Sequence, residues 1–190
     1  MVPFRSITWK DNRLILLDQR QLPHQTVYLD YRQATAVAEA IREMVVRGAP
    51  AIGVTAAFGM VLAAQQSEAA TLDQLQQDLH RVAQQLLAAR PTAVNLAWAV
   101  QRLLAVAQTG PLDDLRQRLL AEAQAIYAED IEINRQIGLT AQPLIPDAAS
   151  VIHHCNTGAL ATVVATRKDA PEFCRAPRAV RADRAGRPSL

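Results

Sequence analysis

Apolar residues recur at three- and four-residue steps through most of the chain between residues 32 and 138. This spacing puts them on one face of an α-helix, and such a face must pack against other apolar surface. Gly48, Pro91 and Gly110 interrupt the pattern, because glycine and proline disfavour a helix interior. The sequence therefore predicts several separate helices that pack on one another as a bundle, in preference to a coiled coil with a partner.

Five helices are predicted in this stretch. Thr71 and Gln74 form a capping box before the third helix, and Gly138 is expected to end the fifth. The second helix falls in a charge-free run, residues 48–67, that is rich in alanine and too weakly apolar for a bilayer span. We expect it to be buried in the protein. The predicted helices cover residues 32–46, a run from Pro50, a run from residue 72, residues 91–107 and residues 112–138.

Three segments near the N-terminus have the composition of short β-strands, because they are partly β-branched or aromatic. Turn residues separate them at Asp11-Asn12 and at Leu22-Pro23-His24. The sequence therefore predicts a small antiparallel sheet ahead of the helices, with strands at residues 4–9, 13–17 and 25–29.

A second structural pattern follows a proline-containing linker at residues 142–147. Residues 150–154 suit a short strand, residues 155–158 a turn that contains glycine, and Ala159 begins a helical segment. A strand, a turn and a helix start form the opening unit of a parallel α/β sheet, which binds ligands at the carboxyl ends of its strands. Cys155 falls at such an end.

The net charge of +2 comes from the last part of the chain. Residues 167–190 hold six arginines and one lysine against three acids, and residues 1–166 carry a net charge of −2. Three interpretations of this tail are open: a basic disordered arm, a solvated charged helix, or non-native sequence. We favour non-native sequence, because no apolar pattern accompanies the arginines. The small overall charge gives no case for nucleic acid or a membrane as partner. Two cysteines form no disulfide framework, so we expect a cytoplasmic protein.

An anion-binding hypothesis rests on the segment that begins with Arg47. Arg47, Gly48 and Ala49 stand at a predicted helix start, where free backbone N–H groups favour an anion, and arginine can bind phosphate with two hydrogen bonds. Arg90 stands at another helix start. An ordinary loop with surface arginines is the alternative for both places.

Cys155 is the candidate nucleophile or proton-transfer group. A turn that leads into a helix start favours the thiolate form of a cysteine. A small buried apolar side chain is the alternative for this residue. His153 and His154 precede it, but their spacing is not that of a structural zinc site, and we predict no metal.

Three segments together resemble the methylthioribose-1-phosphate isomerases, a branch of the wider family of translation initiation factor 2B regulatory subunits. They read Arg-Gly-Ala-Pro-Ala-Ile-Gly at residues 47–53, Arg-Pro-Thr-Ala-Val-Asn-Leu at residues 90–96 and His-Cys-Asn-Thr-Gly-Ala-Leu-Ala-Thr at residues 154–162. The resemblance covers about residues 4–162.

This resemblance implies an aldose–ketose isomerase of methionine salvage that converts methylthioribose 1-phosphate into methylthioribulose 1-phosphate, with no cofactor. Arg47, Gly48, Ala49 and Arg90 would bind this sugar phosphate, and Cys155 would be the catalytic cysteine. The family also implies a homodimer.

Family members continue with a Rossmann-like α/β domain that supplies a catalytic aspartate, a substrate-binding glutamine and an Asn-Lys pair. We therefore expect an α+β N-terminal domain at residues 1–142, made of a small antiparallel sheet and a helical bundle. The first strand, turn and helix of an incomplete Rossmann-like α/β domain would follow at residues 143–166, and an Arg-rich tail at residues 167–190. The chain would then be a fragment with impaired activity. A non-catalytic regulatory protein and a ribose-phosphate isomerase relative are the alternative functions.

Overall fold

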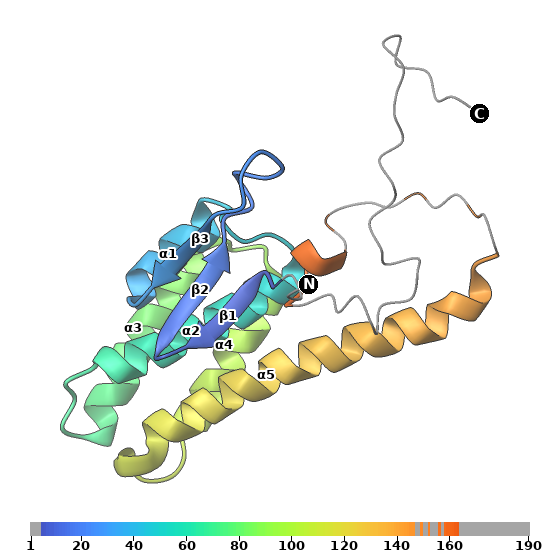
Figure 1. The fold of residues 1–190 in the computed structure, drawn as a ribbon. Helices are drawn as coiled ribbons and strands as arrows, with labels where there is room; N and C mark the ends of the chain where they lie inside the picture. Colours follow the sequence, from blue (N-terminus) through green and yellow to red (C-terminus); the bar gives the residue numbers. More distant parts are fainter. Residues whose placement is uncertain (1–4, 147–148, 150–151, 153–155, 157, 164–190) are drawn as a thin grey trace.

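The computed structural model describes residues 5–146, 149, 152, 156 and 158–163. Three strands come first in the chain and five α-helices follow (Figure 1). The strands are β1 (Ile7–Lys10), β2 (Arg13–Leu17) and β3 (Tyr28–Tyr31). The helices are α1 (Ala34–Arg42), α2 (Ala49–Gln66), α3 (Leu72–Ala89), α4 (Val94–Ala107) and α5 (Leu112–Ala141), with two 3-10 turns, η1 (Gln142–Leu144) and η2 (Gly158–Leu160).

The strands form the predicted antiparallel sheet, in the order β1-β2-β3. Asp11 and Asn12 join β1 to β2 with φ values of 51° and 54°, the left-handed conformation that a two-residue hairpin requires. The third strand was predicted at residues 25–29 and instead starts at Tyr28. Pairing with β2 decides this, since Tyr28 lies opposite Leu17, while the Gln25 N–H is bonded within a turn to the Gln21 carbonyl.

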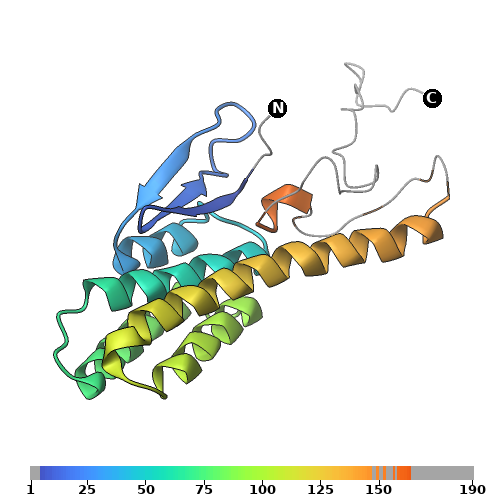
Figure 2. The ribbon, with the colours of Figure 1, turned by 60° about the horizontal axis from the view of Figure 1, so that its bottom comes forward.

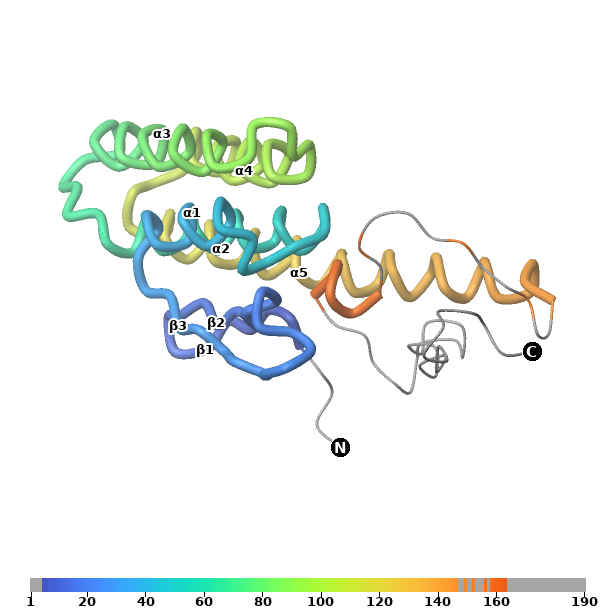
Figure 3. Tube along the Cα trace, turned by 90° about the horizontal axis from the view of Figure 1, so that it is seen from above, coloured from blue at the N-terminus to red at the C-terminus, as the bar shows by residue number. Residues whose placement is uncertain are grey.

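Helix α2 is the centre of the fold. The sheet lies on one side of it and α3 and α4 on the other, with α1 and α5 beside it (Figure 3). By length and composition α2 could cross a membrane, but 78% of it is buried inside this structure, as expected of a core helix. Its alanines and glycines let neighbours approach closely, and Phe58 fills the space below the sheet, where Trp9 stacks on it at 4.8 Å.

The helices around α2 bury the apolar stripes that their sequences predict. The buried residues include Leu75 and Leu79 of α3, Leu96 and Leu103 of α4, and Leu119 of α5. One half of the capping box before α3 is confirmed, because the Gln74 N–H donates to the Thr71 hydroxyl at 3.3 Å. The Gln74 side chain accepts the Ala70 N–H at 3.1 Å, one residue before the N–H that a capping box uses.

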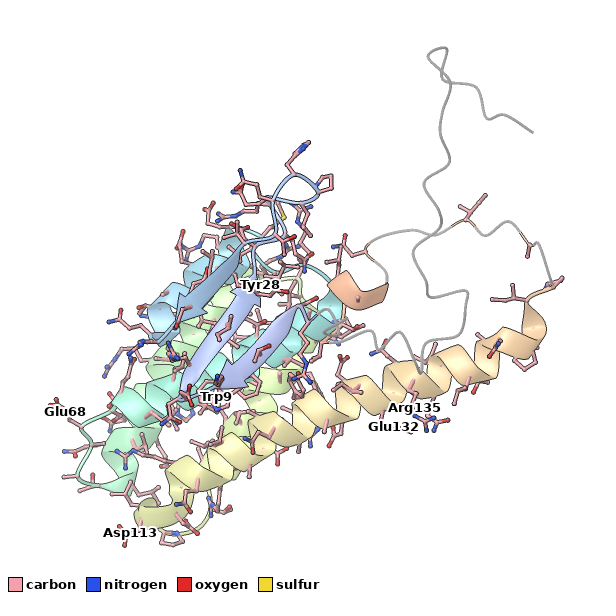
Figure 4. All side chains as sticks on the ribbon, viewed as in Figure 1. Trp9, Tyr28, Glu68, Asp113, Glu132 and Arg135 are labelled. Carbon is pink, nitrogen blue, oxygen red and sulfur yellow. The ribbon has the colours of Figure 1, made fainter. Side chains whose placement is uncertain are left out.

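Helix α5 packs along α2 over its first half and then extends beyond the bundle (Figure 2). The apolar residues of the extension, Ile133 and Ile137, are 56% and 61% exposed. Glu132 and Arg135 form an ion pair on the same part of the helix, far from Asp113 at its start (Figure 4). The predicted end at Gly138 is wrong, since α5 continues to Ala141. A single glycine is therefore tolerated inside this helix.

Two other predicted helix boundaries differ from the structure. Helix α4 starts at Val94, three residues after Pro91. Helix α1 was predicted to reach residue 46 and ends at Arg42. Met44 takes a left-handed conformation with φ of 56°, and the N–H groups of Met44 and Val45 donate to carbonyls of the last helical turn. This pattern is a Schellman motif, in which glycine usually takes the place that Met44 has here.

Met44→Gly is expected to raise the free energy of unfolding by about 0.5–1 kcal/mol, because a left-handed conformation is unfavourable for any residue with a Cβ. Met44 is 44% exposed, so little apolar burial is lost. Thermal unfolding measures the effect, and Met44→Ala is the control, since alanine keeps the Cβ. A Tm for Met44→Gly no higher than that of Met44→Ala would contradict the explanation.

Candidate functional site around the start of helix α2

Two segments far away in the sequence lie against the first turns of α2. A Cβ added at Gly53 would stand 2.9 Å from the Asn95 carbonyl oxygen in the first turn of α4, and one added at Gly48 would overlap the Cα of Ala161. The turn η2 and the start of α2 lie side by side in Figures 1 and 2. Parts of all three segments that carry the family resemblance therefore meet at one end of α2.

Residues 158–163, the docked segment, are held by hydrogen bonds from four parts of the fold. The Ala51 N–H at the start of α2 donates to the Ala161 carbonyl at 3.1 Å. The N–H and the hydroxyl of Ser6 donate to the carbonyls of Val163 and Ala159. The side-chain amide of Gln19 donates to the Leu160 carbonyl at 2.7 Å. The carboxylate of Asp130 accepts the Val163 N–H at 2.9 Å.

Few backbone N–H groups remain free at the start of α2. Pro50 has none, and the Ala51 N–H is bonded to the docked segment. Among the described residues, the N–H groups of Gly48 and Ala49 have no recorded acceptor. Fewer backbone donors are therefore open to an anion at this helix start than the sequence indicated. The predicted site is limited to these two N–H groups and to neighbouring side chains.

Arg47 lies directly before these two residues and is half-buried. Its Nε atom is buried and has no hydrogen-bond partner among the described residues. Leaving such a donor unpaired is unfavourable by about 1–3 kcal/mol. A bound carboxylate or phosphate could accept its hydrogen bond together with those of the Gly48 and Ala49 N–H groups.

Arg90 is half-buried and follows α3 directly as its C-terminal cap. Its carbonyl accepts the Ala93 N–H at 3.0 Å, in the turn that leads to α4. In this segment, the Asn95 carbonyl lies against Gly53 of α2. A role for the Arg90 side chain in the same site stays a prediction.

Cys155, His153 and His154 lie outside the described residues, and so does most of the strand predicted at residues 150–154. The described part of the third motif is Asn156 and the docked segment, with a 3-10 turn where a helix start was expected. The strands that the structure describes are all antiparallel. Among all residues that the structure describes, no group of three or more His, Cys, Asp or Glu side chains is arranged to hold a metal ion.

Sequence reasoning missed Asp130, which stands inside the apolar stripe of α5, four residues after Ile126 and three before Ile133. Burial raises the pKa of its carboxyl above the ordinary value, although hydrogen bonds from Val163 and Asn134 partly oppose this. A lone acid within an apolar stripe was the available signal. The sequence carries no comparable signal for Ser6 or Gln19, because nothing in it links them to residues 158–163.

Gly48→Ala is expected to lower the free energy of unfolding by about 2–4 kcal/mol. Gly48 has φ of 90°, which is unfavourable for alanine, and the added Cβ would also displace Ala161. Gly110→Ala is the matched control, since Gly110 has φ of 80° but faces the flexible end of Arg118. Chemical denaturation compares the two. Equal losses would show that the contact with Ala161 adds nothing.

Comparison with known proteins agrees with this grouping of segments. Residues 45–175 match the Initiation factor 2 subunit family. This range contains all three segments that carry the resemblance.

The curated relatives are named for one activity. A Synechococcus protein named methylthioribose-1-phosphate isomerase is 58% identical over 165 residues, which cover 86% of this chain and 47% of that protein. A Pseudothermotoga lettingae protein named methylthioribose-1-phosphate isomerase 2 is 52% identical with the same coverage. The chain therefore spans about half the length of the curated relatives it matches.

Two solved structures share the fold. The 5-methylthioribose 1-phosphate isomerase from Pyrococcus horikoshii aligns with a TM-score of 0.78 and 36% identity, over 84% of this chain and 46% of that one. The delta subunit of translation initiation factor eIF-2B from A. fulgidus aligns with a TM-score of 0.75 and 38% identity, over 85% of this chain and 47% of that one.

Proposed function

Because the chain belongs to the Initiation factor 2 subunit family, we propose that it carries part of the active site of a methylthioribose-1-phosphate isomerase of methionine salvage. The observation that carries this proposal is the set of unpaired donors at the start of α2. The Arg47 Nε atom and the N–H groups of the next two residues, Gly48 and Ala49, have no acceptor among the described residues. They suit a phosphate group.

The substrate explains why such an enzyme needs acid and base groups. Methylthioribose 1-phosphate carries its phosphate on the anomeric oxygen, so its ring does not open spontaneously as that of a free sugar does. Proton transfer must then be assisted in a sheltered pocket. In this proposal Arg47, Gly48, Ala49 and Arg90 hold the phosphate end, and Cys155, three residues before the docked segment in the sequence, takes part in proton transfer.

The remainder of such a site would come from a second α/β domain of the Rossmann type, which in the resembled family supplies the catalytic aspartate. The docked segment supports this division, because it is the point at which residues after α5 return to the N-terminal domain. A homodimer and a cytoplasmic location, both expected of the family, belong to the same proposal.

The non-catalytic alternative is less well supported. The fold alone does not decide between the functions, since the isomerase and the initiation-factor subunit align almost equally well. The names of the curated relatives do favour one of them, because proteins at 46–58% identity are named methylthioribose-1-phosphate isomerase.

The phosphate site can be tested by titrating the chain with methylthioribose 1-phosphate and with unphosphorylated methylthioribose. We expect binding of the phosphorylated sugar only, and we expect Arg47→Ala to weaken it about tenfold or more, since one charge-assisted contact is lost. Arg42→Ala is the control, because Arg42 is an exposed arginine of α1 that pairs with Glu39. Equal binding of both sugars, or equal effects of the two variants, would overturn the assignment.

The role of Cys155 can be tested by turnover. We expect Cys155→Ala to abolish any conversion of methylthioribose 1-phosphate that the chain supports, while binding is retained. Conversion that Cys155→Ala leaves unchanged would remove this residue from the mechanism.

A further inference from the structure

Asp130 is the one ionisable side chain among the four residues that hold the docked segment. The other three contribute a serine, a glutamine amide and a backbone N–H. The docked segment itself contains no charged residue. Among the described residues, no basic side chain pairs with Asp130, whose hydrogen bonds come from the Val163 N–H and the Asn134 amide.

A carboxylate is an unfavourable choice for this place if its only task is to support the fold. Because burial raises the pKa of Asp130, the folded state binds its proton more tightly than the unfolded state does. The stability that this group contributes is therefore present below its unfolded pKa and is lost as pH rises through the raised folded value. An asparagine would accept the same Val163 N–H without this loss.

We propose that Asp130 is a positioning residue that fixes the docked segment against the first turn of α2, and thereby fixes the backbone around Gly48 at the site of phosphate binding. The geometry supports this step by step. Asp130 bonds Val163 at one end of the docked segment, and two residues earlier the Ala161 carbonyl accepts the Ala51 N–H. Ala161 also contacts Gly48 so closely that no side chain fits between them.

The consequence concerns which N–H groups of α2 face a ligand. With the docked segment in place, the Ala51 N–H is occupied, and in the described part of the chain only the N–H groups of Gly48 and Ala49 at this helix start have no acceptor. Release of the docked segment would free the Ala51 N–H and remove the contact that fixes the backbone at Gly48. Asp130 would therefore act on phosphate affinity through the backbone, without touching the phosphate.

Amide hydrogen exchange of the full chain tests the docking directly. We expect Asp130→Leu, which cannot accept a hydrogen bond, to speed exchange of residues 159–163 and of the Ala51 N–H by about tenfold or more at neutral pH, with the rest of α2 and α4 unchanged. Asp130→Asn should keep the protection, because its amide oxygen can accept the Val163 N–H. Glu129→Gln is the matched control, since Glu129 is the neighbouring acid and pairs with Arg102. Equal exchange in wild type and Asp130→Leu, or equally fast exchange in Asp130→Asn and Asp130→Leu, would overturn the proposal.

The pH profile separates the carboxylate from a purely structural group. The titratable group beside Asp130 among the described residues is Tyr127 of the same helix, and the hydroxyl of Tyr127 also interacts with Arg5 ahead of β1. The Val163 N–H bond lowers the pKa of Asp130 and is therefore stronger to the charged carboxylate. We expect protection of residues 159–163 in wild type to rise, relative to Asp130→Asn, as pH rises through the titration of Asp130. A constant ratio of the two exchange rates across this range would overturn the role of the charge.

The link to phosphate rests on the proposed function and has its own measurement. Titration with inorganic phosphate should show an affinity several times lower in Asp130→Leu than in Asp130→Asn, with Glu129→Gln like wild type. Equal affinities in the first two variants would overturn the positioning role. If wild type bound no phosphate at all, the proposed function would fail while the exchange result still stood.

Discussion

Burial of helix α2 on all sides is the constraint on which the rest of the structure depends. The sheet, α1, α3, α4 and α5 each pack against it, and its small residues let them do so closely. A helix covered along its length can meet a ligand only at an end. The start of α2 is that end, and the described parts of the three segments with family resemblance gather there. Core packing and site assembly are thus set by the same helix.

The sequence allowed the helices to be predicted well, because their apolar stripes are regular and the breaks between them carry glycine or proline, or, before α3, the capping residue Thr71. Boundaries were harder wherever a tertiary contact decided them. Helix α1 ends four residues early because Met44 and Val45 close a Schellman motif, and the Val45 carbonyl then accepts the Gln19 N–H. Neither event leaves a periodic signal. The last turns of α5 were predicted to pack in the bundle, but their apolar residues are exposed. Here a regular apolar stripe is present, and periodicity alone does not show whether another element covers it.

The candidate site was predictable in its residue types and not in its geometry. Arg47, Gly48 and Ala49 could be named from the helix start, but the occupied Ala51 N–H depends on a segment more than a hundred residues later in the chain. The fold is shared by an isomerase and by an initiation-factor subunit. What distinguishes functions within such a family therefore lies in the side chains of its sites and not in the fold.

The hydrogen bonds of the docked segment also have a consequence for the order of folding. The hydroxyl of Ser6 reaches a carbonyl 153 residues further along the chain, and Gln19 reaches one 141 residues away. Closing loops of this length is entropically unfavourable until both partners are already held in place. The sheet and bundle therefore form first and present a finished surface to the returning segment. During synthesis, the same separation delays docking until residues 158–163 have left the ribosome, whereas the bundle has all of its residues earlier.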